Sequence, residues 1–182
     1  TALWANQSSR SRDFTSVLHQ NGLVSSRYLK LRLIENATLK NLALTGFTNT
    51  AAIQAAVSDW KFDSLATKAD AVVFLEISDI AFSSQHANTL WPKLLATMTV
   101  ASTRGNTQLG KQDYQVRINA EQADQRDKRP DRLGSFQSVN ELMASPRRVV
   151  KILNAELDKI AQLMASDLEK LTHGKELRWG SV

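Results

Sequence analysis

The chain has 182 residues, of which 42% are hydrophobic and 23% are charged, as is ordinary for one globular domain with a substantial core. It has no cysteine, which excludes disulfides, thiolate metal ligands and a cysteine nucleophile. No apolar stretch approaches the roughly 18 residues that span a bilayer. The net charge of +5 comes from scattered lysines and arginines, and not from one basic block, which disfavours nucleic acid as a partner. Composition therefore predicts a single domain over residues 1–182.

The first third of the chain is predicted to hold two helices and one strand. Residues 1–10 are polar and are expected to be loose, and residues 11–22 have the apolar spacing of a short helix. Residues 27–34, RYLKLRLI, alternate strictly, which predicts a half-buried strand. Residues 49–60 are predicted to form the second helix, with Trp60 on its buried face.

Residues 69–82, ADAVVFLEISDIAF, begin as a continuous apolar run and end as an alternating one. Both faces of the run are apolar, which predicts a central strand covered on both sides. Two more strands are predicted at residues 93–102 and 111–119. Gly105 and Asn106 lie between them, where a hairpin turn needs residues that tolerate positive φ. These three strands are therefore expected to pair antiparallel.

The last third is predicted to be a loop followed by one long helix. Residues 119–134 carry a balanced set of charges and form an exposed charged loop. Ser145 and Pro146 start the helix and Gly174 ends it, which gives roughly 27 residues and a length of about 40 Å. Its apolar residues recur at three- and four-residue steps: Val149, Leu153, Leu157, Ile160, Met164, Leu168 and Leu171.

These elements predict an α+β fold. It is a two-layer sandwich with a mainly antiparallel sheet of about four strands, helices on one face and a long C-terminal helix.

No pattern in the sequence indicates a catalytic, cofactor-binding or metal-binding site. His19, His86 and His173 lie far apart and lack metal-ligand spacing. A nucleophile elbow, a phosphate-binding loop and a dinucleotide fingerprint are all missing. Glu76 and Asp79 lie at the end of the apolar run, where a carboxylate is more often solvated or paired than catalytic. The chain is therefore predicted to be no enzyme and to need no cofactor.

Trp4, Trp91 and Trp179 fall in segments that are predicted to be loop or terminus. Exposed aromatic side chains are common anchors for protein partners. Trp91 and Trp179 are therefore the candidate partner-binding residues. The alternative is that each folds back over an edge of the core.

The helix and strand that end at residue 80, the turn and strand at residues 106–118, and the long terminal helix together resemble small bacterial envelope proteins. Such proteins include outer-membrane lipoproteins and domains similar to the N-terminal domain of TolB. The resemblance covers about residues 50 to 172. It implies a non-enzymatic, periplasm-facing accessory or assembly subunit, attached to the outer membrane peripherally or through a lipidated cysteine upstream of Thr1. A sheet edge or the exposed face of the long helix would dock a protein partner or another copy of the chain.

A function of another class, a cytosolic nucleic-acid-binding domain, is also open. Lys30, Arg32 and Arg117 occupy outward positions of two predicted strands. If they converge with Arg104 on one sheet face beside an exposed tyrosine, that face offers both phosphate contacts and base stacking. The positions of these side chains therefore distinguish a nucleic-acid-binding domain from an envelope accessory subunit.

Overall fold

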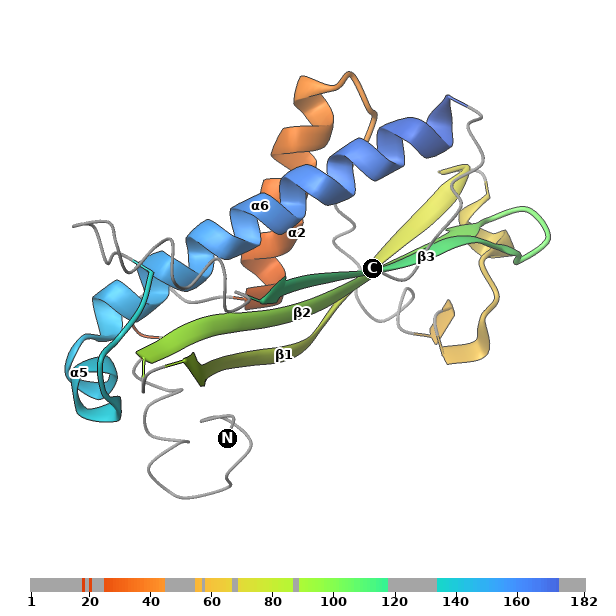
Figure 1. Cartoon of the computed structure of the whole chain (residues 1–182). Coiled ribbons are helices and arrows are strands. Elements are labelled where there is room, and N and C mark those ends of the chain that lie inside the picture. The colour runs from red at the N-terminus through yellow and green to blue at the C-terminus, as the bar shows by residue number, and fades with distance from the viewer. Residues whose placement is uncertain are drawn as a thin grey trace.

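A computed structural model describes residues 18, 20, 25–44, 55–56, 58–66, 69–86, 89–117 and 134–173. The described elements, in chain order, are α2 (Ser25–Leu39), the 3-10 helix η1 (Asp63–Leu65), β1 (Ala71–His86), β2 (Thr89–Ser102), β3 (Gln108–Arg117), α5 (Val139–Ala144) and α6 (Pro146–Thr172) (Figure 1). The predicted α+β class is confirmed, with an antiparallel sheet and a long C-terminal helix. Across these ranges, no helix combines the length and the apolar character needed to cross a membrane.

The sheet has three strands in the order β1-β2-β3, and both pairs are antiparallel. β2 is thus the central strand. The hairpin that joins β2 to β3 turns at Gly105 and Asn106, whose φ angles are 83° and 53°. Glycine and asparagine tolerate this left-handed region better than other residues, so the predicted hairpin is confirmed.

The predicted strand at residues 27–34 is wrong, because these residues lie in α2. Leu29, Leu33 and Ala37 are buried at four-residue steps, whereas Leu31 is 51% exposed. Leucines two residues apart fit the period of a strand, but the burial follows the period of a helix. The described part of the chain therefore has three strands and not four.

Both long helices share one core with the sheet. Every second residue of β2 from Leu94 to Val100 packs into this core, together with Tyr114 of β3 and the buried face of α6. Figure 1 shows α6 running along the strands, with α2 crossing it. Burial along α6 follows the predicted three- and four-residue steps through Leu168, so the prediction for this helix is confirmed.

α5 was not predicted, although its capping sequence was visible. The hydroxyl of Ser138 accepts a hydrogen bond from the Glu141 amide at 3.1 Å, and the Glu141 carboxylate accepts one from the Gln137 amide at 2.7 Å. This reciprocal arrangement is close to a capping box, which a serine followed three residues later by a glutamate indicates in a sequence.

Several predictions concern residues outside the described ranges. They are the loose start at residues 1–10, nearly all of the helix at residues 11–22, and residues 119–133 of the charged loop. Trp4 and Trp179 also lie there. Of the predicted helix at residues 49–60, the positions 55, 56, 58, 59 and 60 are described; the first four are helical, and residue 60 lies in a turn.

Replacing Leu33 by alanine tests the assignment of α2 as a helix. Leu33→Ala should lower the free energy of unfolding by roughly 2–5 kcal/mol, because the residue is fully buried. The matched control Leu31→Ala should change it by less than about 0.5 kcal/mol, because Leu31 is half exposed. Urea denaturation measures both values. Equal losses at the two positions would instead fit a strand with both leucines on one buried face.

Candidate interaction edge

Three aromatic rings gather at one end of the sheet, on the face opposite the main core. Trp60, Phe62 and Phe74 have ring centroids 5.1 to 6.1 Å apart. Phe62 is fully buried, Phe74 is half-buried and Trp60 is 37% exposed. We call these three residues the aromatic corner. Trp60 was predicted to be a core residue, and its partial exposure shows that this prediction was wrong.

The β2–β3 hairpin holds the aromatic corner in place through Asn106. The indole Nε1 of Trp60 donates to the Asn106 carbonyl at 2.8 Å, and the Phe62 amide donates to the Asn106 side-chain oxygen at 2.6 Å. The side-chain amide of Asn106 donates to Asp63 at 2.7 Å. Figure 1 shows this segment, in gold, beside the hairpin.

One of these residues has a strained backbone. Trp60 has a φ angle of 51°, which for a bulky residue costs on the order of 1–3 kcal/mol, whereas Asn106, at 53°, tolerates this region better. Such strain persists only where the surroundings fix it. The sequence did reveal that Asn106 is a turn residue, but not that it contacts a segment 43 residues earlier in the chain.

The segment that the sequence marks as a central strand lies at the edge of the sheet. Residues 71–77 of β1, which we call the edge segment, pair with β2 on one side, and no described strand pairs with them on the other. The prediction of a central strand is therefore corrected for the described sheet. The prediction of apolar cover on both faces is confirmed near the start of β1, where Val72 and Phe74 pack with Phe62 while Val73 packs on the main core.

A β-bulge ends the edge segment. The register of β1 against β2 shifts between Ile77 and Asp79, which leaves Ser78 as an extra residue. One extra residue reverses which face each later side chain occupies. Ile77 and Ile80 therefore both pack on the main core although they are three residues apart. The sequence changes from a continuous apolar run to alternation at Glu76, because the face that Phe62 covers at Val72 and Phe74 is exposed to solvent there.

The hydrogen-bond phase of β1 identifies which backbone groups face outward. The Thr103 amide donates to the Asp70 carbonyl at 3.1 Å, so Asp70 points its backbone groups toward β2. Successive residues of a strand alternate in this respect. Val73 and Leu75 therefore direct their amides and carbonyls away from β2, and Phe74 directs its own toward it.

The two edges of the sheet differ in character. Exposed residues of β3 include Lys111, Asp113 and Gln115, and charged and polar side chains of this kind discourage strand addition. The outward-facing residues of the edge segment, Val73 and Leu75, are instead apolar and half-buried. An apolar edge that ends at a bulge is a short, well-defined template for another strand.

Trp91 is not the exposed anchor that the sequence predicted, because only 2% of its surface is exposed. Pro92 suggested a loop, since proline is rare inside central strands. β2 nevertheless begins at Thr89 and contains both residues. β3 ends at Arg117, opposite Lys93, so the missing amide of Pro92 falls beyond the last pair of the β2–β3 ladder.

The basic residues do not converge as nucleic-acid binding would require. Lys30 and Arg32 lie on α2, whereas Arg104 lies in the hairpin and Arg117 in β3. Arg104 is paired with Asp70 at 3.6 Å. Neither tyrosine is exposed on a sheet face: Tyr114 is buried, and Tyr28 lies half-buried on α2, where its hydroxyl donates to Asp158. The expected arrangement on one open sheet face is therefore absent among the described residues.

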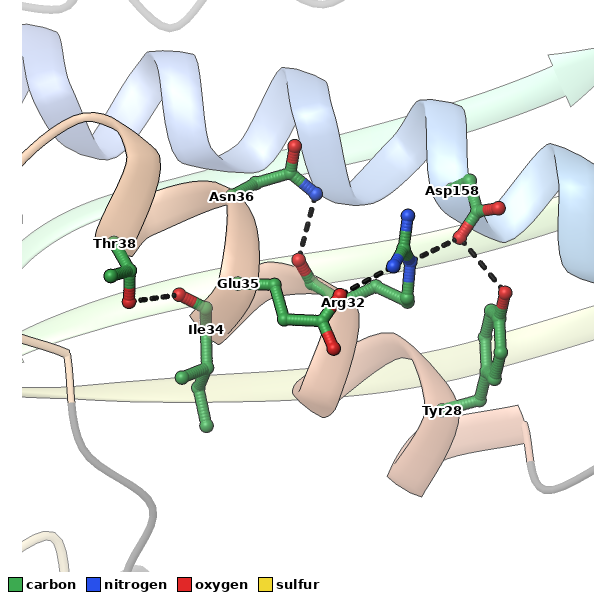
Figure 2. A network of polar contacts seen from close by, with 7 residues as sticks. All are labelled: Tyr28, Arg32, Ile34, Glu35, Asn36, Thr38 and Asp158. Carbon is green, nitrogen blue, oxygen red and sulfur yellow. Dashed lines mark hydrogen bonds and ion pairs between the residues drawn. The ribbon is translucent and has the colours of Figure 1, made fainter.

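A polar network joins α2 to α6 (Figure 2). Asp158 accepts a hydrogen bond from the Tyr28 hydroxyl at 3.0 Å and an ion-paired one from Arg32 at 2.7 Å. Arg32 also pairs with Glu35, one turn along α2. Burial and the bond to Asp158 raise the pKa of Tyr28, and the same carboxylate raises the pKa of Arg32. Each charged group has a protein partner, so the network acts as a clamp between helices.

Two further contacts extend this clamp. Lys40, in the turn just after α2, pairs with Glu169 of α6 at 2.6 Å, which lowers the pKa of Glu169. The Tyr114 hydroxyl donates to Asp167 at 2.9 Å, and burial together with this bond raises the pKa of Tyr114. α6 is thereby fixed both to α2 and to β3.

The carboxylates of β1 are exposed or paired. Glu76 is exposed to solvent, and Asp79 forms an ion pair with Lys93 of β2. The described ranges contain no cluster of three histidine or carboxylate residues that could hold a metal ion. The most distinctive feature of the described surface is thus the edge segment with its aromatic corner.

No protein-family model, curated protein or solved structure matches the chain. Its function is therefore inferred from its own residues and from the sequence resemblance described above.

Replacing Asn106 by glycine tests how the aromatic corner is held. Glycine keeps the positive φ at no cost but removes both side-chain hydrogen bonds, so Asn106→Gly should lose about 1–3 kcal/mol of unfolding free energy. Asp63→Ala removes one of the two bonds and should lose less. Urea denaturation followed by tryptophan fluorescence measures both. An Asn106→Gly variant as stable as the wild type would contradict this account of the hairpin contact.

Proposed function

We propose that this chain is a non-enzymatic, periplasm-facing accessory subunit of the bacterial cell envelope that docks a protein partner through strand addition at the edge segment. One observation supports the proposal most directly. The edge segment has the apolar composition of a central strand, but its outward backbone groups have no described strand as a hydrogen-bond partner. An added strand would pair these groups and cover the half-buried side chains at once.

The aromatic corner supports docking at this place. Phe74 belongs to the edge segment and packs against Trp60 and Phe62 on the face opposite the main core. A strand added beside β1 would meet main-chain groups along the edge and aromatic surface next to it. Main-chain bonds give affinity in such complexes, and side-chain pockets give selectivity.

The envelope location is supported by the sequence resemblance of residues 68–80 and 106–118 to small envelope lipoproteins. These residues include the edge segment and all of β3. A subunit of this type would be held at the outer membrane, facing the periplasm, by a lipid anchor or by peripheral attachment.

We also propose the two-layer arrangement, with α2 and α6 as the helical layer on one face of the sheet. It is supported by the single core that both helices share with the three strands. The exposed side of α6 would then be a second surface open to contacts.

The test is to express the full-length gene in its native host and follow the mature protein. We expect it in the membrane fraction with the added mass of a diacyl or triacyl group, and in a complex heavier than the single chain after mild solubilisation. Val73→Pro should release it from that complex, because proline removes an outward amide from the edge without removing a bond to β2.

Val73→Ala is the matched control, since it loses the same apolar side chain but keeps the amide, and it should remain in the complex. An unmodified, uncleaved protein in the cytosol would contradict the envelope location. A Val73→Pro variant that folds and stays in the complex would contradict docking at this edge.

A further inference from the structure

We infer that the edge segment pairs with the same segment of a second copy of this chain, antiparallel and centred on Phe74, which joins two sheets into one. This inference rests on the proposed function, because it names the partner of the same edge. It follows from the hydrogen-bond phase, the apolar pattern and the charges of β1.

The pairing has a natural centre. The edge segment begins at Ala71, where β1 begins, and stops at the bulge after Ile77, so its middle residue is Phe74. Antiparallel pairing about Phe74 places Val73 opposite Leu75 of the second copy and Ala71 opposite its Ile77. All four of these positions point their backbone groups outward, as hydrogen-bonded pairs require. The whole segment can therefore pair with itself without an unmatched outward group.

The same register matches the side chains. Ala71, Val73, Leu75 and Ile77 all pack toward the main core, so a two-fold axis perpendicular to the sheet would continue this apolar row from one copy into the other. On the opposite face the two Phe74 rings would meet at the axis, each supported by Trp60 of its own chain. Aromatic pairs across a non-hydrogen-bonded position are among the favourable cross-strand contacts.

The charges are compatible with this register. Glu76 would lie opposite Val72 of the second copy, and Asp70 opposite its Ser78, so no two carboxylates face each other. A register centred on Glu76 would instead place two glutamates directly opposite, which is destabilising. A second copy also has the same open edge, so one pairing covers two edges, whereas a different partner would cover one.

Single-cysteine trapping tests the register, because the chain has no cysteine of its own. In the proposed pair the two Phe74 Cα atoms would be about 4.5 Å apart, within the range that a disulfide spans. The two Glu76 Cα atoms would be offset by four residues, about 13 Å, too far for a disulfide. Under mild oxidation of the purified chain, Phe74→Cys should form a disulfide-linked dimer at least about tenfold faster than Glu76→Cys.

Glu76→Cys is a demanding control. Glu76 is more exposed than Phe74, so random collisions would link Glu76→Cys faster. Equal or faster linking of Glu76→Cys, or a folded Phe74→Cys variant that stays monomeric, would overturn the inference. If Phe74→Cys fails to fold, an equimolar mixture of Val73→Cys and Leu75→Cys tests the same register. The mixed disulfide should then exceed each homodimer by far more than the twofold excess that random pairing gives, and a ratio at or below twofold would overturn the register.

The outcomes separate this inference from the proposed function. If these variants do not link but Val73→Pro still releases the protein from its cellular complex, the edge docks a different protein and self-pairing is wrong. If Val73→Pro stays in the complex, both fail together.

Discussion

Backbone amides and carbonyls need hydrogen-bond partners, and β1 supplies these partners on one side only within the described sheet. The order of the strands, the main core and the aromatic corner can each be related to this edge. β2 takes the central position and fixes the register of both neighbours. On one face, the sheet shares the main core with α2 and α6. On the other face, the aromatic corner covers the first part of β1. The outward backbone groups of β1 are then the groups of this packed strand that no described strand pairs.

Two local devices set the extent of this edge. The bulge at Ser78 ends the edge segment and moves the later side chains to opposite faces. The hairpin residue Asn106 holds Trp60 and Phe62 against Phe74, despite the strained backbone of Trp60. A short edge that is already held in the extended conformation loses little conformational freedom when another strand binds. The clamp of Asp158 with Tyr28 and Arg32 fixes the helices behind it.

The sequence was sufficient where local pattern and tertiary burial agree. α6 follows a helical period over its whole length, and the turn at Gly105 and Asn106 needs only local chemistry, so both could be predicted. α2 could not, because Leu29, Leu31 and Leu33 satisfy a strand period and burial alone shows that Leu31 faces outward. Trp91 was misplaced because Pro92 suggested a loop. Pro92 nevertheless fits in β2, because the last pair between β2 and β3 is Lys93 with Arg117, so β3 does not reach Pro92. The edge position of β1 depends on the order of the strands, which local patterns do not encode.

The most direct measurement is amide hydrogen exchange of β1 in a dilute solution of the single chain. If the edge is open, the amides of Val73 and Leu75 should exchange rapidly, while the Phe74 amide between them, which faces β2, should be protected by orders of magnitude more. This alternation would establish an edge that is available for pairing. Equal, strong protection of all three amides in the monomer would mean that another part of the chain already covers the edge, and would contradict the account.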